Sequence, residues 1–425
     1  MNDLLPGAVD AWQRFEAVLR QVTAAYGYRE IRTPVLERTA LFQRSIGADT
    51  DIVSKEMYTF SDLNGESLTL RPEATASCVR AGLEHGLFHN QQQRFWYAGP
   101  MFRHEKPQKG RYRQFHQFGI EAFGWPGPDI DAEIIAVGER LWRTLGIDPV
   151  VLEINSLGSG ESRRRFRDEL VAYLSAREGA LDAESRRRLQ TNPLRVLDSK
   201  HPETQAVIAA APSLIDYLDG DCRRHFDGLC ARLDDLKVNY RINPRLVRGL
   251  DYYSRTVFEW ATDRLGAQNA ICAGGRYDGL VETLGGKPVP AAGFALGIER
   301  VLELLALSNP LAPSIVPDLF IAAFGERADR TALVVAERLR SAGMTVVSHC
   351  GGGGAKRQLR QADRSGAQYA LVLGDDELAR GEISVKPLRS DASQFVVSLS
   401  QIENELETLL RSAPAQPETG AHDRS

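Results

Sequence analysis

The chain has 425 residues, of which 43% are hydrophobic and 25% charged, and its formal net charge is −4. That length exceeds what one hydrophobic core usually serves, so we expect a soluble globular protein of two or three domains. The sequence has no signal-like start and no apolar run long enough to cross a membrane, which predicts a cytoplasmic protein. Its five cysteines lack Cys-x-x-Cys spacing, which favours reduced buried thiols over disulfides or a zinc site.

The N-terminal segment is predicted to be a helix followed by a strand. Apolar residues recur at helical spacing between Trp12 and Val22, and Gly27 lies close to the end of this pattern. The next apolar segment, 30–36, is predicted to be a strand. Because Pro34 cannot donate a hydrogen bond to a neighbouring strand, we expect this strand at a sheet edge or a bulge.

A second strand is predicted over 67–75, where apolar and polar residues alternate before the chain enters a polar turn. Glu73 and Thr75 then stand on one side of the strand end. From the pattern alone, a solvated carboxylate and hydroxyl are the more common outcome at such a position. A pair that binds a ligand is the alternative.

The most informative stretch, Phe102–Gly124, is predicted to form two strands joined by a basic loop that contains Gly110. In the returning strand, side chains alternate between the two faces of the sheet. One face then receives Arg111, Arg113, Gln117 and Glu121, and the other receives Tyr112, His116, Phe118 and Ile120. Arginines, an amide and a carboxylate make a poor hydrophobic core. They suit a ligand that carries both anionic and cationic groups.

The middle of the chain is predicted to be a helical insertion over 160–235. Arginine runs such as Ser162-Arg-Arg-Arg and Ser185-Arg-Arg-Arg punctuate its helical patterns. Such runs are more often solvated faces than binding surfaces. Arg195, Asp198 and Lys200 also belong to this insertion, and the sequence gives no function for them.

Three further segments combine glycines with charged or aromatic residues. Residues 245–260 begin as a turn that contains Arg248 and become an alternating strand. Residues 270–279 contain paired glycines, which allow the backbone to approach a ligand closely. Residues 292–300 lead from a strand into a helix whose first turn carries Arg300. The helix dipole favours an anion there, although a surface arginine on a core helix is an equally good interpretation.

The C-terminal part is predicted to be a separate α/β domain. Residues 308–317 form a linker with three prolines, after which strands and helices alternate, and this alternation favours a largely parallel sheet. A helix after a run of glycines places Lys356, Arg360 and Arg364 on one face. That face suits a phosphate backbone, and a solvated stripe is an equal alternative. The tail, 412–425, is expected to be disordered.

These motifs resemble the class II aminoacyl-tRNA synthetases, and in detail the histidyl-tRNA synthetase family. The helix and strand that precede Pro34 resemble the first class II motif, Phe-Arg-x-Glu with the following loop and Arg resembles the second, and 292–300 resembles the third. Leu-Val-Arg-Gly-Leu-Asp-Tyr-Tyr and Gly-Gly-Arg-Tyr-Asp resemble two peptides peculiar to the histidyl family.

The resemblance covers nearly the whole chain and implies an α+β fold. It implies an antiparallel-sheet catalytic core over 1–159 and 236–308, with the helical insertion over 160–235 and an α/β anticodon-binding domain over 317–411. The implied reaction activates L-histidine with ATP and Mg²⁺ and transfers it to tRNA(His). The resemblance also implies a homodimer.

The resemblance further implies roles for individual residues. Arg103 and Arg248 would carry catalysis, the first at the α-phosphate and the second between that phosphate and the histidine carboxylate. ATP would be bound by Arg103, Glu105, Arg111 and Arg300. The histidine site would comprise Glu73, Ala74, Thr75, Gln117, Glu121, Arg248, Tyr252 and Tyr253, with Glu121 and Tyr253 at the imidazole nitrogens. The candidates for tRNA contacts are Gln108, Arg113, Lys356, Arg360 and Arg364. No residue is assigned to a metal.

Two other interpretations are open. A regulatory, histidine-binding paralogue of ATP phosphoribosyltransferase would resemble the catalytic core, but it would lack the C-terminal domain and much of the histidyl motif set. A class IIa synthetase for threonine, proline or glycine would share the three class II motifs without the two histidyl peptides. The presence of Arg248, Tyr253, Arg300 and a full C-terminal domain favours the ligase over both.

Overall fold

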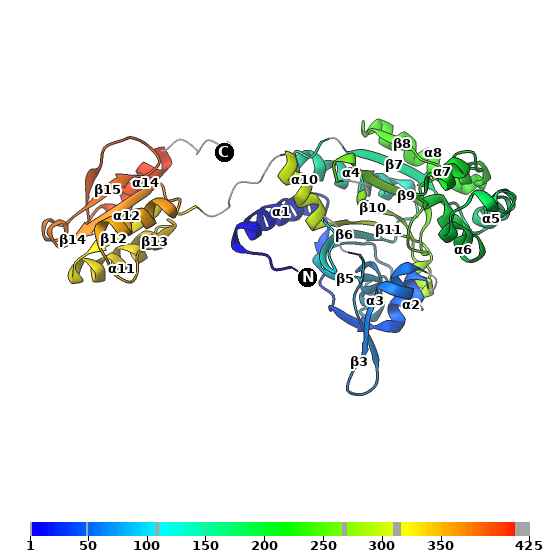
Figure 1. The fold of residues 1–425 in the computed structure, drawn as a ribbon, viewed down its shortest axis with the longest axis horizontal. Coiled ribbons are helices and arrows are strands. Elements are labelled where there is room, and N and C mark those ends of the chain that lie inside the picture. The colour runs from blue at the N-terminus through cyan, green and yellow to red at the C-terminus, as the bar shows by residue number, and fades with distance from the viewer. Residues whose placement is uncertain are drawn as a thin grey trace. The chain divides into compact units, whose positions relative to one another are not determined.

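The computed structural model describes residues 2–47, 50–106, 110–148, 150–265, 270–308 and 316–412. Its contacts divide the chain into two compact units, 1–311 and 312–425, each with its own hydrophobic core (Figure 1). The first unit combines a large sheet with helices, and the second unit is an α/β domain, so the predicted α+β fold with a C-terminal α/β domain is confirmed. In the described parts of the chain, no helix is both long and apolar enough to span a bilayer.

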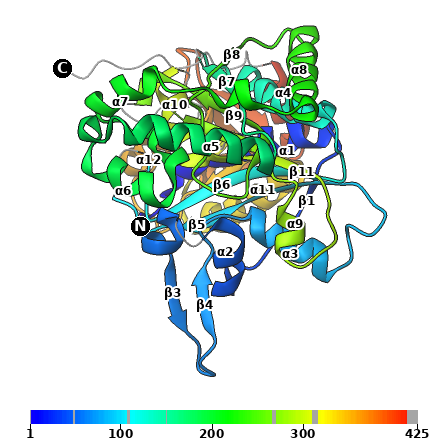
Figure 2. The ribbon, with the colours of Figure 1, turned by 90° about the vertical axis from the view of Figure 1, so that its right-hand side faces the viewer.

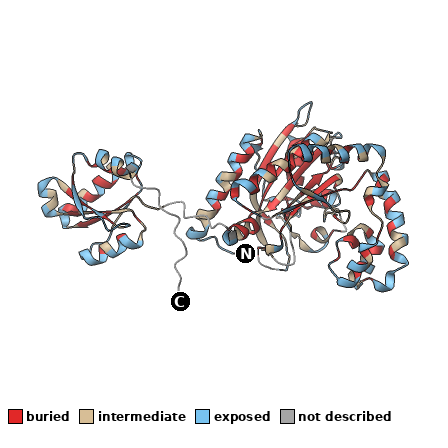
Figure 3. Ribbon diagram, turned by 90° about the horizontal axis from the view of Figure 1, so that it is seen from above, coloured by how far each residue is buried: buried red, intermediate tan, exposed pale blue. Residues whose placement is uncertain are grey.

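An eight-stranded sheet forms the centre of the first unit. Its strand order is β1-β5-β6-β11-β10-β9-β7-β8, and all neighbours are antiparallel except the outermost pairs, β1 with β5 and β7 with β8. Buried strands appear in red through the middle of this unit in Figure 3. The strands are β1 (Arg29–Glu30), β5 (Gln93–Phe102), β6 (Gln114–Phe123), β7 (Val151–Ser156), β8 (Tyr240–Ile242), β9 (Ser254–Ala261), β10 (Ala270–Arg276) and β11 (Ala291–Gly297).

Four helices share a hydrophobic core with one face of this sheet. Helix α1 contributes Trp12, Phe15 and Leu19, which recur at helical spacing as the sequence predicts. On the strands, Phe118 and Ile120 point into the same core. Residues of β6 that alternate with these therefore face the other side of the sheet. The four helices are α1 (Pro6–Ala25), α4 (Pro128–Leu145), α8 (Gly220–Asp235) and α10 (Ile298–Ser308).

The predicted strand over 30–36 is wrong, because the chain changes sheets within it. β1 ends at Glu30, and β2 begins at Leu36 in a separate three-stranded sheet of order β2-β4-β3. The side chain of Arg71 fixes the stretch between them, since its Nη1 donates to the carbonyl oxygen of Thr33 at 2.9 Å. The hairpin of β3 and β4 projects from the unit in Figures 1 and 2. The elements of this region are β2 (Leu36–Arg38), α2 (Thr39–Ile46), the π-helical turn η1 (Ile52–Glu56), β3 (Tyr58–Ser61), β4 (Ser67–Leu70), α3 (Thr75–Glu84) and α9 (Leu280–Thr283). The 3-10 turn η5 (Asp263–Leu265) follows β9.

Residues 160–235 are helical, as the pattern indicates. Side-chain oxygens of Ser159, Asp182 and Asp219 accept backbone N–H groups at the starts of α5, α6 and α8, which is the usual cap chemistry. Helices α5 to α7 enclose their own small core, whereas α8 packs on α4 in the main core (Figure 2). The remaining elements are α5 (Gly160–Ser175), η2 (Glu178–Ala180), α6 (Ala183–Thr191), the 3-10 helix η3 (Pro193–Asp198), α7 (Pro202–Ala209) and η4 (Leu214–Tyr217).

The second unit is an α/β domain, but its sheet is not largely parallel. In the order β13-β12-β14-β15-β16, β12 is parallel to both neighbours, while β15 is antiparallel to β14 and β16. Only the short helix α13 connects β14 to β15, and a parallel crossover needs a dozen or more residues. The elements are β12 (Leu319–Phe324), α11 (Glu326–Ser341), β13 (Val346–Ser348), α12 (Ala355–Arg364), β14 (Tyr369–Gly374), α13 (Asp375–Arg380), β15 (Glu382–Pro387), β16 (Phe395–Ser398) and α14 (Ile402–Ser412). Apart from Ser412, the predicted disordered tail lies outside the described residues, as does most of the predicted linker.

Candidate active site

A cavity of about 190 Å³ lies on the face of the eight-stranded sheet opposite the main core. Nearly every residue predicted to bind histidine lines it, although these residues come from three separate stretches of the chain. The exception is Ala74, which is fully buried and does not border the cavity. The polar lining residues are Glu73, Thr75, Tyr97, Arg103, Gln117, Glu121, Arg248, Tyr252, Tyr253 and Tyr277. We call this space the first cavity.

Glu73 lies at the start of α3, in the wall of the first cavity. Its carboxylate accepts the backbone N–H groups of Thr75 at 2.7 Å and Ala76 at 3.0 Å, so it occupies the positive end of the helix. Burial raises the pKa of Glu73, while these backbone bonds oppose the rise. A carboxylate has about four lone-pair sites, so Glu73 keeps acceptor capacity for a ligand.

Glu121, on β6, is almost completely buried. Its Oε1 accepts from the hydroxyl of Thr75 at 2.6 Å, and its Oε2 accepts from the hydroxyl of Tyr277. Burial raises the pKa of Glu121 to about 8. Gly293 on β11 makes room for this side chain, since a β-carbon there would lie 2.1 Å from Oε2. Glu121 is therefore a buried acceptor that is held in place from two sides.

Tyr277 was not predicted as a site residue. It belongs to the Gly-Gly-Arg-Tyr-Asp segment, whose paired glycines predicted a close approach of the backbone to a ligand but assigned no function to the tyrosine. The preceding Arg276 is fully buried and points elsewhere: it pairs with Asp131 at 3.0 Å and with Asp278 at 2.9 Å. Arg276 therefore stabilises the fold through buried ion pairs, whereas Tyr277 lines the first cavity.

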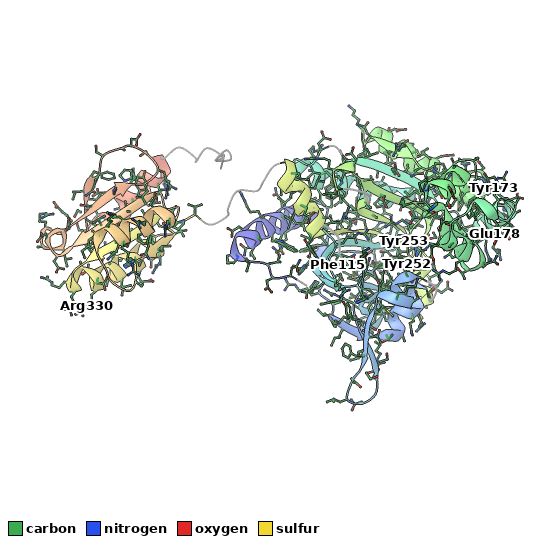
Figure 4. All side chains as sticks on the ribbon, in the orientation of Figure 1. Phe115, Tyr173, Glu178, Tyr252, Tyr253 and Arg330 are labelled. Carbon is green, nitrogen blue, oxygen red and sulfur yellow. The ribbon has the colours of Figure 1, made fainter. Side chains whose placement is uncertain are left out.

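Arg248 and the two tyrosines that follow it close another side of the first cavity. The rings of Tyr252 and Tyr253 are 4.7 Å apart, and burial raises the pKa of Tyr253 to about 12 (Figure 4). Arg248 donates from Nη1 to the carboxylate of Glu259 at 2.6 Å. Within the part of the chain that the structure describes, its Nε is buried without a hydrogen-bond partner. Like Tyr277, Glu259 was not among the predicted site residues.

A second cavity of about 120 Å³ adjoins the first, and Arg103 and Gln117 line both. All four residues predicted to bind ATP border it. The lining residues are Arg103, Glu105, Gly110, Arg111, Tyr112, Phe115, Gln117, Gly297, Glu299 and Arg300. The two cavities therefore lie next to each other, on either side of Arg103 and Gln117.

Arginines outnumber carboxylates in the lining of the second cavity, three to two. Arg111 donates to Glu105 at 3.0 Å, and Arg103 lies 3.6 Å from the same carboxylate. Burial, and next to it the charge of Arg111, lowers the pKa of Arg300. Three arginines facing so small a space favour a ligand with several negative charges.

Phe115 supplies a flat apolar surface in the second cavity, with the guanidinium of Arg103 5.3 Å from its ring centre. Phe115 was not among the predicted site residues, although it has the same parity along the strand as Gln117 and Glu121. The predicted alternation within β6 is confirmed: Gln117 and Glu121 line the first cavity, whereas Phe118 and Ile120 enter the main core on the other face of the sheet.

The alternation fails before β6 begins at Gln114. Tyr112 lines the second cavity together with Arg111, so the prediction that these neighbours face opposite ways is wrong. Only an isolated bridge at Arg111 precedes the continuous strand, so the period of two does not apply there. Arg113, a predicted tRNA contact, borders neither cavity, and its carbonyl accepts the backbone N–H of Arg103 at 2.9 Å.

The remaining tRNA candidates lie in the second unit, except Gln108, which is outside the described residues. Lys356, Arg360 and Arg364 are exposed on α12, where they line one groove together with Arg357 and Gln361. No group of three or more His, Cys, Asp or Glu side chains that could hold a metal ion is found among the residues described.

Comparison with known proteins agrees with this geometry. The family model described as histidyl-tRNA synthetase matches residues 1–301, and the model described as anticodon binding domain matches residues 318–409. A histidine–tRNA ligase of Thiobacillus denitrificans (strain ATCC 25259 / T1) is 58% identical over 402 residues, which cover 94% of this chain and 96% of that protein. A histidine–tRNA ligase of Aromatoleum aromaticum (strain DSM 19018 / LMG 30748 / EbN1) is 57% identical over 405 residues, which cover 95% and 92%.

A solved structure is similar along nearly the whole length. The crystal structure of apo S. aureus histidyl-tRNA synthetase superposes with a TM-score of 0.81 at 36% identity, covering 96% of this chain and 98% of that one. The chain therefore belongs to the histidyl-tRNA synthetase family of class II aminoacyl-tRNA synthetases and carries an anticodon-binding domain.

Proposed function

We propose that the chain is a histidine–tRNA ligase, which converts L-histidine and ATP to histidyl-adenylate and then transfers histidine to tRNA(His). The observation that carries this proposal is the junction of the two cavities at Arg103 and Gln117. One cavity offers buried carboxylates and phenols, and the other offers arginines beside an aromatic ring. An amino acid and a nucleotide that occupy them would meet at Arg103.

The α-ammonium group of histidine would bind between Glu73, Thr75 and Gln117. An ammonium group is donor-only, and Glu73 and Gln117 present acceptors to it. The Oε1 atom of Gln117 is buried and has no hydrogen-bond partner among the described residues. Such an atom is costly unless a ligand satisfies it. This unmet acceptor supports an amine at that position.

Glu121 and Tyr253 would bind the imidazole ring. A neutral imidazole has one N–H donor and one acceptor nitrogen, and a carboxylate with a phenol can satisfy both. Buried groups of this kind reject amino acids that lack the N–H by roughly 10⁴–10⁵, because their own hydrogen bonds would be lost. Selection of histidine then follows from the first cavity alone.

In the first step, a carboxylate oxygen of histidine attacks the α-phosphorus of ATP. A new oxygen–phosphorus bond forms, and the bond to the pyrophosphate oxygen breaks. The attacking carboxylate is already ionised near neutral pH, so the step needs no general base. The difficulty is the approach of two anions, which positioning and preorganised positive charge overcome.

Arginines supply this positive charge. Arg103, at the junction of the cavities, would hold the α-phosphate, while Arg300 and Arg111 would hold the outer phosphates. Arg248 would bridge the histidine carboxylate and the α-phosphate. Its bond to Glu259 fixes the guanidinium through Nη1 and leaves the buried Nε for the substrates.

Mg²⁺ is usually held by one or two carboxylates together with phosphate oxygens. Glu105 and Glu299 line the second cavity and are the carboxylates that fit this role. The bound ion would neutralise charge on the phosphates. Glu105 also pairs with Arg111 and Arg103, so its carboxylate would offset part of the repulsion between these arginines and the ion.

The tRNA would reach both units. The helical insertion, 160–235, and Arg113 would lie toward the acceptor end, and Lys356, Arg360 and Arg364 on α12 would face the anticodon arm. The exposed groove on α12 with its additional Arg357 supports a phosphate-bearing partner. A tRNA substrate supports a cytoplasmic location, and resemblance to the first class II motif supports a homodimer.

Exchange of pyrophosphate into ATP, with each amino acid offered in turn, tests the proposal. Exchange that depends on histidine alone, followed by histidine transfer to tRNA(His), is the expected result. Histidine binding without any exchange would overturn the proposal and favour the regulatory paralogue. The 58% identity to a histidine–tRNA ligase over 94% of this chain argues against that alternative.

A further inference from the structure

The segment that carries Arg248 is held along its length by the helical insertion. We call residues 245–253 the Arg248 loop. At its start, Arg245 donates to the carbonyl oxygen of Pro212 at 2.6 Å. At its end, the carbonyl oxygen of Tyr253 accepts from Arg163 of α5 at 3.0 Å. The loop therefore contacts the insertion on both sides of its catalytic residue.

Arg195 of η3 contacts the loop directly beside Arg248. A β-carbon on Gly249 would lie 3.1 Å from Nη1 of Arg195, so the guanidinium lies against the glycine backbone. On its other side, Nη2 of Arg195 is 3.8 Å from the carboxylate of Asp51. The side chain is only 16% exposed. Arg195 thus lies between two separate parts of the cavity rim.

Neighbours of Arg195 reinforce this arrangement. Asn192 donates to the carboxylate of Asp251 in the Arg248 loop at 3.3 Å, and Arg188 lies 3.6 Å from Asp51. Just after Asp51, the turn η1 begins with Ile52, which lines the first cavity. One short stretch of the insertion, residues 188–195, therefore holds both the Arg248 loop and the segment that carries Ile52.

The end of the loop is joined to the entry of the insertion by backbone bonds. Arg255 has a φ of +48°, which is uncommon for a residue with a side chain. Its N–H donates to the carbonyl oxygen of Gly158 at 3.1 Å, and its own carbonyl accepts from Leu157 at 2.6 Å. A strained conformation persists when its surroundings fix it. Movement of the insertion would therefore reach Tyr253 through this connection.

We propose that the helical insertion positions Arg248 for histidine activation, and that Arg195 is the positioning residue through which it does so. The inference rests on the proposed function and deepens it. The insertion then serves the first half-reaction, in the absence of tRNA, as well as any contact with the acceptor arm. Arg195, Asn192 and Asp51 form the clamp, and none of them touches the reacting atoms.

The test is a double-mutant cycle on the full-length protein, with histidine-dependent pyrophosphate exchange as the assay. Arg195→Ala is expected to lower kcat by roughly 10²-fold, the loss that follows a displacement of about 1 Å in a catalytic group, with both KM values close to those of the parent. In an Arg248→Ala background the same change should add little, because the residue it positions is gone. Arg195→Lys keeps the charge near Asp51 but loses the planar contact with Gly249, and an intermediate kcat is expected.

Arg164→Ala is the matched control, since Arg164 is exposed on α5, and it should exchange like the parent. If Arg195→Ala fails to fold, Asp51→Ala removes the other side of the clamp and should give the same loss of kcat. Parental kcat in either folded variant, or a loss that is fully additive with Arg248→Ala, would overturn the inference. A parent protein that shows no histidine-dependent exchange would instead refute the proposed function.

Discussion

Replacement of Tyr277 by phenylalanine examines the histidine-selecting end of the site. The change removes the hydroxyl that donates to Oε2 of Glu121 and leaves the ring, which packs 5.5 Å from that of Tyr252. The other carboxylate oxygen keeps its bond from Thr75 at 2.6 Å. The variant therefore weakens the support of Glu121 without opening the cavity.

The expected loss follows from the hydrogen bond removed. A hydrogen bond to a charged group contributes roughly 1.5–3 kcal/mol, and about 1.4 kcal/mol corresponds to a tenfold change in rate, so kcat/KM for histidine should fall by roughly 10- to 150-fold. Burial raises the pKa of Glu121 to about 8, and the bond from Tyr277 opposes that rise. Loss of the bond should therefore raise the pKa further.

The assay is pyrophosphate exchange as a function of pH on both sides of pH 8. Because ionised Glu121 accepts the imidazole N–H, kcat/KM for histidine should rise with pH through the pKa of the free protein. The ratio of variant to parent cancels the titration of histidine itself. The profile of Tyr277→Phe should move to higher pH, and Tyr173→Phe, in the insertion, should match the parent. A Tyr277→Phe profile that coincides with the parent, or moves to lower pH, would refute this account of Glu121.

Three further predictions concern other parts of the site and chain. Arg248→Ala should lower adenylate formation by roughly 10²–10³-fold, as for the loss of one preorganised donor, and near-parental turnover would remove its assigned role. Glu121→Gln should change how stability depends on pH: the folded protein keeps a proton on Glu121 between the usual value of 4.5 and about 8, so the free energy of unfolding of the parent falls as pH rises through that range. Denaturant titrations should show that this part of the slope is absent in the variant, and equal slopes would contradict the raised pKa. A chain that ends near residue 309 should keep pyrophosphate exchange but charge tRNA poorly, since it lacks the second unit; equal charging by both forms would show that this unit does not read the anticodon arm.

Local periodicity predicted those parts of the site that one strand determines. Gln117 and Glu121 reach the first cavity because they alternate with Phe118 and Ile120, which enter the core. The same alternation places Phe115 on the cavity face of β6, so it too was predictable from the sequence. The family resemblance, rather than periodicity, brought Arg248 and Tyr253 into the same hypothesis.

Other features depend on contacts between distant segments, which no local pattern contains. Tyr277 reaches Glu121 because β10 and β6 flank β11, and Glu259 reaches Arg248 from the middle of β9. Where the chain changes sheets near Pro34, Arg71 binds the backbone, and that contact joins residues that are 38 positions apart in the sequence. Arg195 had no assigned function for the same reason, since its partners lie in two other parts of the chain.

The most direct test of the central claim is a crystal structure of the protein with a non-hydrolysable analogue of histidyl-adenylate. The imidazole should lie between Glu121 and Tyr253, the phosphate surrogate between Arg103 and Arg248, and the adenine beside Phe115. An analogue bound outside the two joined cavities, or bound with its ring away from Glu121, would contradict the account.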